Sequence, residues 1–163
     1  QPVKEEFKLQ PIVEDLSDYI HFIFAEKAVR IKNEISPSFT LYSDPGMIRM
    51  ALRNIIANAV KFSHTGQDVE VHAQQETNGW AIQIKDYGIG MNEDQLYKAL
   101  NGQLSRFGTK GEVGSGIGLS LVRQFIENQG GKLIGQARVN QGCVFTITLP
   151  SQSSGAKINV HFS

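Results

Sequence analysis

The chain has 163 residues, and its 16 basic side chains balance its 16 acidic ones. This balance argues against a broad nucleic-acid-binding surface, because binding along a phosphate backbone requires a basic excess. The length suits one domain with a sizeable core. No apolar stretch approaches the roughly 20 residues of a membrane span, and the polar N-terminus is unlike a signal peptide.

The lone cysteine, Cys143, excludes an intrachain disulfide and a zinc site built on cysteines. It lies in a strand-like run, which predicts a small buried hydrophobic side chain rather than a nucleophile. We therefore expect a soluble domain in a reducing compartment. The start without an initiator Met suggests a piece of a longer protein.

The N-terminal part of the chain predicts one strand, one helix and two further strands. A short strand is expected at residues 7–10. Apolar residues at helical spacing then predict a helix from residue 12 to about residue 28. Glu14 and Asp15 are expected near its first turn, where the helix dipole favours acidic side chains. Residues 29–35 alternate apolar and polar side chains, and residues 39–42 are also strand-like.

A longer helix is predicted from Pro45 to about residue 62, with Asp44 as its N-cap. Its apolar face is formed by Leu52, Ile55, Ile56 and Ala59. At about 100° per residue, Asn54, Asn58 and Lys61 fall on a narrow polar stripe beside that face. Asparagine is a middling-to-poor helix former, so two of them four residues apart indicate a functional role. An exposed polar stripe is the alternative.

The rest of the chain predicts two hairpin-like strand pairs and two helices. Strands at 69–73 and 80–84 flank a turn at 77–79. A short helix is expected at 92–100, a helix at 119–129, and closing strands at 132–137 and 142–149. Residues 101–113 are polar, basic and without clear periodicity, which predicts a mobile loop. The Ser-rich residues 151–163 are typical of a linker or tail, so the domain is expected to span residues 1–150.

The glycine-rich stretch at residues 111–120 leads directly into the helix that begins near Leu119. Glycines allow a close backbone approach, and the first turn of a helix presents unpaired N–H groups, so an anion such as phosphate fits here. The stretch is neither a P-loop nor a dinucleotide fingerprint, because it lacks the spacing of both. A mobile surface loop is the alternative interpretation of this stretch alone.

Three motifs in order resemble a known family. Asn54-Ile-Ile-Ala-Asn58-Ala-Val-Lys61-Phe62, then Asp86-Tyr-Gly88-Ile-Gly90, then Gly114-Ser-Gly116-Ile-Gly118-Leu119 resemble the N, G1 and G2 boxes of sensor histidine kinases. Their catalytic domain belongs to a superfamily with DNA gyrase, Hsp90 and MutL. The resemblance covers about residues 6–150. It implies an α+β fold of the Bergerat type: a two-layer α/β sandwich with a mixed, mostly antiparallel sheet and three main helices on one face.

The resemblance also implies a site for ATP and Mg²⁺. By similarity, Asp86 accepts a hydrogen bond from the adenine amino group, since a carboxylate is an acceptor only. Asn58 matches the Mg²⁺ ligand, and a single amide oxygen suits a cation that keeps waters and phosphate oxygens. Lys61 is expected to reach a phosphate. Asn54 stands where the hydrolytic relatives carry a glutamate base, so weak hydrolysis is expected.

Further roles implied by the resemblance are assigned less directly. Gly88 and Gly90 would let the backbone pass close to the base, and Gly114, Gly116, Gly118 and Leu119 would shape the lid hinge and the phosphate site. Arg106, Thr109 and Lys110 are candidates for steering the β- and γ-phosphates, with solvated loop charges as the alternative. Phe107, Leu96 and Tyr97 compete for the variable F box. His64 could approach a phosphate or face solvent.

None of the four histidines in the chain has the context of the family's phosphoacceptor. The resemblance therefore implies a partner domain that dimerises and carries the acceptor histidine, and beyond it the receiver domain of a response regulator. The fragment is expected to be monomeric and cytoplasmic, within a parent that is a membrane-associated sensor. A serine-phosphorylating relative and a non-catalytic ATP-binding switch remain alternatives.

Overall fold

The computed structural model describes residues 3–104, 108–110, 118–151, 160 and 162. In chain order, its elements are β1 (Glu5–Lys8), α1 (Gln10–Ile23), a 3₁₀ turn η1 (Ala25–Lys27), β2 (Arg30–Asn33), β3 (Thr40–Ser43), α2 (Pro45–Lys61), β4 (Asp68–Glu76), β5 (Gly79–Asp86), α3 (Glu93–Leu100), α4 (Gly118–Asn128), β6 (Lys132–Arg138) and β7 (Gly142–Pro150).

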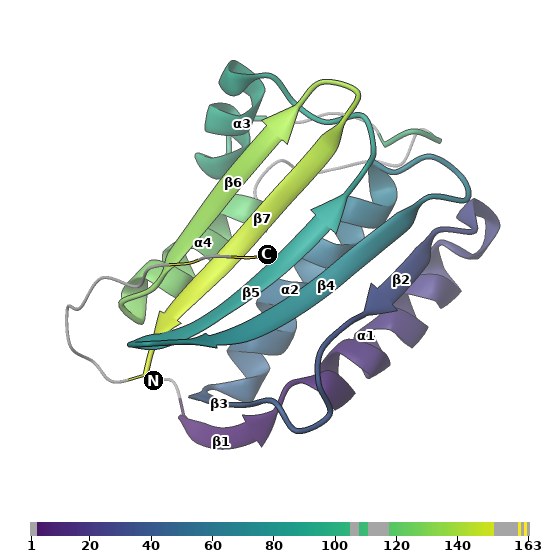
Figure 1. The fold of residues 1–163 in the computed structure, drawn as a ribbon. Coiled ribbons are helices and arrows are strands. Elements are labelled where there is room, and N and C mark those ends of the chain that lie inside the picture. The colour runs from purple at the N-terminus through teal and green to yellow at the C-terminus, as the bar shows by residue number, and fades with distance from the viewer. Residues whose placement is uncertain (1–2, 105–107, 111–117, 152–159, 161, 163) are drawn as a thin grey trace.

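The main sheet has five strands in the order β2-β4-β5-β7-β6. The β2–β4 pair is parallel and the other three pairs are antiparallel. The helices of the described residues all cover one face of this sheet, and none of them lies on the other face (Figure 1). The expected two-layer sandwich with a mixed, mostly antiparallel sheet is thus confirmed.

The core lies between the sheet and the helices, because alternate strand residues point toward the helices. On the sheet side it contains Val69, Val71, Ile82, Ile84 and Ile147. On the helix side, α2 contributes Leu52, Ile55 and Ile56, each at most 1% exposed. The predicted apolar face of this helix is therefore its buried face. Cys143 is also buried, as expected.

The N-terminal region differs from the sequence-based expectation in three ways. The first strand ends at Lys8, and α1 begins at Gln10, so Glu14 and Asp15 do not lie in its first turn. α1 ends at Ile23, not near residue 28, because the backbone leaves helical geometry at Phe24 and continues as η1. β1 and β3 form a separate two-stranded antiparallel sheet beside the main one.

The other predicted elements are confirmed to within a few residues. The β4–β5 pairing closes at Glu76 and Gly79, so the turn lies at the predicted position. α3 begins with a capping box in which Asn92 and Gln95 each accept a backbone hydrogen bond from the other. α4 ends before Gly130, whose φ of +82° suits a helix C-terminus. The described parts of the predicted loop, residues 101–104 and 108–110, form no helix or strand, and most of the predicted tail falls outside the described residues.

Candidate functional site

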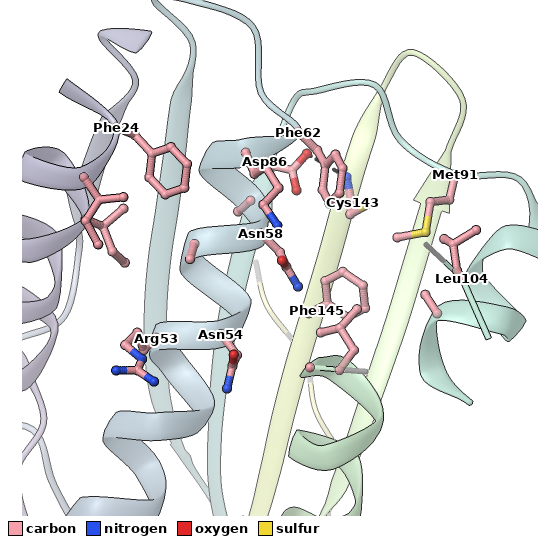
Figure 2. Close-up of a pocket in the computed structure, with 18 of the residues that line it drawn as sticks. Phe24, Arg53, Asn54, Asn58, Phe62, Asp86, Met91, Leu104, Cys143 and Phe145 are labelled. Atoms are coloured by element: carbon pink, nitrogen blue, oxygen red, sulfur yellow. Dashed lines mark hydrogen bonds between the residues drawn. The ribbon is translucent and has the colours of Figure 1, made fainter. Parts of the chain in front are cut away.

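A cavity of about 590 Å³ opens between α2, the ends of β5 and β7, and the start of α4. Figure 2 shows Asn54, Asn58 and Asp86 on one side of α2, with Arg53 and Phe24 toward α1. The residues that line the cavity are Tyr19, Ile20, Ile23, Phe24, Arg53, Asn54, Ala57, Asn58, Ala59, Lys61, Phe62, Asp86, Met91, Ala99, Leu104, Gly118, Leu119, Cys143 and Phe145.

Helix α2 supplies the polar wall of the cavity. Its start is fixed by Asp44, whose Oδ1 accepts hydrogen bonds from the N–H groups of Gly46 (2.9 Å) and Met47 (3.2 Å). Because the apolar face of α2 is buried against the sheet, Asn54, Asn58 and Lys61 are left at the cavity. The predicted polar stripe is therefore a cavity wall and not a fully solvated surface.

The Asn54 side chain is held by its own helix. Its Nδ2 donates to the Met50 carbonyl at 3.0 Å. A Cβ on Gly118, at the start of α4, would lie 3.4 Å from Asn54 Oδ1. Such a Cβ would make an ordinary contact, so the first turn of α4 lies beside Asn54, and its residues Gly118 and Leu119 line the cavity.

Asp86 ends β5 and is only 5% exposed. Its Oδ1 accepts hydrogen bonds from the N–H groups of Gly88 (3.0 Å) and Cys143 (3.2 Å). One donor follows β5 directly and the other lies on β7, and together they fix the direction of the carboxylate. A buried carboxylate held in this way presents a hydrogen-bond acceptor to the cavity.

Gly88 and Gly90 contact neighbouring backbone and do not line the cavity. A Cβ on Gly88 would lie 1.9 Å from the Phe62 carbonyl oxygen, and one on Gly90 would lie 1.8 Å from the Arg138 carbonyl oxygen. Gly90 also has φ of +65°. Between them, the Ile89 N–H donates to the Phe62 carbonyl at 3.0 Å. The two glycines allow the turn after β5 to pack on the end of α2 and on the β6–β7 turn.

Thr109 and Lys110 contact protein carbonyls at the end of α2 and near it. The Thr109 N–H donates to the Lys61 carbonyl at 3.1 Å, and its hydroxyl donates to the Ser63 carbonyl at 2.6 Å. Lys110 Nζ donates to the Glu26 carbonyl at 3.3 Å. Neither residue lines the cavity. Their role toward a phosphate stays a prediction.

The remaining predicted positions are divided between described and undescribed parts of the chain. Leu119 lines the cavity at the start of α4. Leu96 packs against the core, Tyr97 is largely exposed, and His64 is exposed at the end of α2. Arg106, Phe107, Gly114 and Gly116 lie outside the described residues.

The sequence interpretation missed the apolar residues that line the cavity and one buried lysine. Apolar side chains line much of the cavity, among them Met91, Leu104 and Phe145, and they suit a flat ring. Lys27 is 2% exposed, and its Nζ donates to the Lys61 carbonyl at the end of α2. No local pattern indicates either group, because both depend on contacts between distant parts of the chain.

Comparison with known proteins assigns the family. The family described as histidine kinase-, DNA gyrase B-, and HSP90-like ATPase matches residues 43–153. The chain belongs to this ATPase family. Its fold also matches the catalytic domain of the histidine kinase ThkA, with a TM-score of 0.78 at 20% identity over 93% of this chain and 97% of that one. The full-length histidine kinase ShkA in complex with AMPPNP matches with a TM-score of 0.76 at 23% identity, over 96% of this chain and 33% of that one.

Curated relatives of this ATPase domain are sensor kinases. An uncharacterized sensor-like histidine kinase of Rhizobium meliloti (strain 1021) is 34% identical over 134 residues, which are 80% of this chain and 26% of that protein. The adaptive-response sensory kinase SasA of Prochlorococcus marinus is 33% identical over 112 residues, which are 68% of this chain and 29% of that protein. The chain thus spans little more than a quarter of these relatives. Among the described helices, none is long and apolar enough to cross a membrane.

Proposed function

We propose that residues 1–150 form the ATP- and Mg²⁺-binding catalytic domain of a protein histidine kinase. The domain would transfer the γ-phosphoryl group of ATP to a histidine on a separate dimerisation domain. The observation that carries this proposal is the placing of Asp86, Asn54 and Asn58 around one cavity. The membership of the chain in an ATPase family and its sensor-kinase relatives support it.

The base of ATP fits the end of the cavity that Asp86 occupies. Met91 and Phe145 provide apolar walls there, and the Asp86 carboxylate provides an acceptor. Adenine offers a donor amino group at its 6-position, whereas guanine offers a carbonyl, which a carboxylate repels. ATP is therefore preferred over GTP.

The phosphate end lies along the polar wall of α2. Among the described residues, no group of three or more His, Cys, Asp or Glu side chains could hold a metal ion. A cation at this site would therefore take few protein ligands, and the Asn58 amide oxygen suits Mg²⁺, which retains water and phosphate oxygens. Lys61 orients phosphate as a point charge. Bound ATP with Mg²⁺ supplies the transferable phosphoryl group.

Asn54 limits the reaction with water. Its amide cannot accept a proton, and the loss of a positioned general base costs on the order of 10²–10⁴ in rate. Slow hydrolysis preserves ATP for transfer to a protein acceptor. We propose that this acceptor domain and a response-regulator receiver domain are the partners, and that the domain acts in the cytoplasm.

Calorimetry tests the nucleotide site. Wild type should bind ATP in the presence of Mg²⁺, with GTP binding much weaker. Asp86→Asn should lose ATP binding, because its amide presents a donor toward the adenine amino group, and Asn58→Ala should lose the Mg²⁺-dependent part. Asn78→Ala, in the β4–β5 turn at the far end of β5, is the matched control and should bind as wild type does. No binding by wild type would refute the proposal.

Transfer is tested by mixing the chain with a separate histidine-containing dimerisation domain and labelled ATP. Phosphohistidine is labile to acid and phosphoserine is not, so acid treatment identifies the acceptor. Label that is lost in acid and absent with Asn58→Ala supports a histidine kinase. Acid-stable label would support the serine-phosphorylating relative, and nucleotide binding without transfer would support a switch module.

A further inference from the structure

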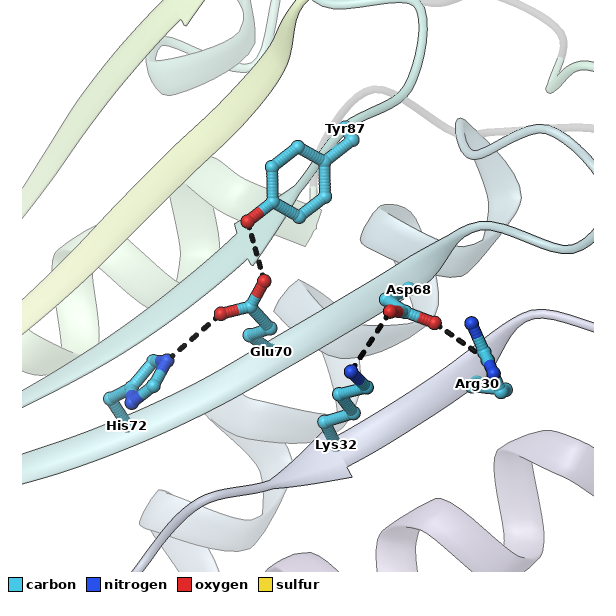
Figure 3. Close-up of polar contacts among 6 residues, drawn as sticks. All are labelled: Arg30, Lys32, Asp68, Glu70, His72 and Tyr87. Atoms are coloured by element: carbon cyan, nitrogen blue, oxygen red, sulfur yellow. Dashed lines mark hydrogen bonds and ion pairs between the residues drawn. The ribbon is translucent and has the colours of Figure 1, made fainter.

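Asp86, the last residue of β5, and Tyr87, which follows it, point to opposite faces of the sheet. Asp86 is buried on the helix side, where it lines the cavity. Tyr87 is 39% exposed, and its hydroxyl reaches Glu70 on β4 (Figure 3). The residue next to the base-binding candidate is therefore anchored on the face of the sheet opposite the described helices.

Tyr87 is held by three contacts, and its partner Glu70 makes a fourth with His72. Its hydroxyl donates to Glu70 Oε2 at 2.5 Å, and the other carboxylate oxygen of Glu70 lies 3.2 Å from His72 Nε2. Lys85 Nζ lies 5.0 Å from the centre of the Tyr87 ring. Gln67 Nε2 donates to the Tyr87 carbonyl at 3.0 Å. Both the side chain and the backbone of Tyr87 are thus held.

The charge states strengthen the contact between Tyr87 and Glu70. The hydrogen bond from Tyr87, with a smaller contribution from His72, holds the pKa of Glu70 below its usual value. The hydrogen bond to Glu70, together with partial burial, raises the pKa of Tyr87 to about 12. At neutral pH a neutral phenol therefore donates to a charged carboxylate, which is stronger than a hydrogen bond between neutral groups.

The anchor acts on Asp86 through the peptide unit between Tyr87 and Gly88. The Gly88 N–H that donates to Asp86 Oδ1 belongs to the peptide formed with the Tyr87 carbonyl. That carbonyl is the one that Gln67 holds. Fixing Tyr87 therefore fixes the donor that orients the Asp86 carboxylate, and freedom at Tyr87 would let this donor move.

We propose that Tyr87 and Glu70 are positioning residues that aim the Asp86 carboxylate at the 6-amino group of a purine nucleotide. The proposal rests on the proposed function, because it assumes that Asp86 binds the base. It goes further by assigning part of the base specificity to a hydrogen bond on the opposite face of the sheet.

The test compares ATP with purine riboside triphosphate, which lacks the 6-amino group and cannot donate to Asp86. Tyr87→Phe and Glu70→Ala, which each remove one partner of this hydrogen bond, should each weaken ATP binding by roughly threefold to tenfold, the range expected for one net hydrogen bond. Binding of purine riboside triphosphate should change by less than about twofold. The double variant should lose no more than either single variant, because both remove the same interaction.

Tyr42→Phe is the matched control, since Tyr42 is half exposed on β3 in the smaller sheet. It should bind both nucleotides as wild type does, and thermal denaturation should show that every variant is folded. If wild type binds no ATP, the proposed function fails. If wild type binds ATP and the Tyr87 and Glu70 variants keep full affinity, or lose affinity for both nucleotides equally, the positioning role is refuted.

Discussion

At the residue scale, Asp44 shows how one carboxylate sets the start of the helix that carries the polar wall. Oδ2 accepts the Val3 N–H at 2.8 Å, while Oδ1 caps the first turn of α2. The hydrogen bond from Val3, followed by those from Met47 and Gly46, holds the pKa of Asp44 below its ordinary value of 3.8. The charged form is therefore favoured in the folded state.

Asp44→Ala should lower the free energy of unfolding at pH 7 by about 0.5–2 kcal/mol, the usual loss for an N-cap. Because the folded-state pKa is depressed, this stabilisation is complete well above 3.8 and is lost as pH falls through the lower folded-state pKa. Urea denaturation from pH 7 to pH 2.5 should therefore show the difference between wild type and Asp44→Ala shrinking in acid.

Asp44→Asn is the control for that titration. Its amide oxygen can still cap the helix but has no carboxyl proton to gain, so its stability relative to Asp44→Ala should stay nearly constant with pH. A wild-type advantage that persists unchanged at pH 2.5 would show that the charged carboxylate is not the source of the stabilisation.

At the element scale, the end of α2 is joined to two other segments. The last helical carbonyl, that of Lys61, accepts hydrogen bonds from both Lys27 Nζ and the Thr109 N–H. Carbonyls in the last turn of a helix have no intrahelical partner, and a cation there also complements the helix dipole. Lys27 therefore links η1 to the end of the wall that carries Asn58 and Lys61.

Lys27→Met should lower the free energy of unfolding by about 1–3 kcal/mol, because it keeps the length of the side chain but leaves a buried carbonyl with less hydrogen bonding. Faster hydrogen exchange of the Thr109 amide should accompany the loss. Lys4→Met, at an exposed position before β1, is the control and should change neither quantity. Wild-type stability in Lys27→Met would contradict the assigned link.

The elements were largely predictable, whereas their connections were not. The spacing of Asn54 and Asn58 and the cap at Asp44 are local features. The sequence alone therefore predicted the start of α2 and the position of both asparagines on this helix. The early end of α1 escaped prediction, because apolar spacing continues past residue 23 while the backbone leaves helical geometry at Phe24, with φ of −108° and ψ of 37°. Lys27 and the Cys143 N–H act on the site only through long-range packing, which no local pattern encodes.

At the scale of the whole molecule, ligand binding is coupled to folding. The cavity is assembled from α1, α2, β5, β7 and α4, so an unfolded chain cannot form it. A ligand that binds only the folded state stabilises it by an amount that grows with the logarithm of the ratio of ligand concentration to dissociation constant. Nucleotide binding is therefore measurable as a gain in stability of the entire chain.

ATP with Mg²⁺ at about 100 times its dissociation constant should add about 2.7 kcal/mol, equivalent to an increase in Tm of roughly 5–10 °C for a chain of this size. Differential scanning calorimetry measures this shift. Asp86→Asn should show almost none, and GTP should give a much smaller shift with wild type. An equal shift in Asp86→Asn would mean that ATP binds elsewhere.

The packing of two turns against each other beside Asp86 has a consequence for folding kinetics. The turn after β5 rests on the β6–β7 hairpin, since a side chain on Gly90 would strike the Arg138 carbonyl and one on Gly142 would strike the Asp86 carbonyl. Some fifty residues separate these partners, so their contact closes a long loop and comes late in a typical folding reaction. During refolding, competence to bind nucleotide should therefore appear only after β6 and β7 have joined the sheet, which makes ATP a reporter of the final assembly step.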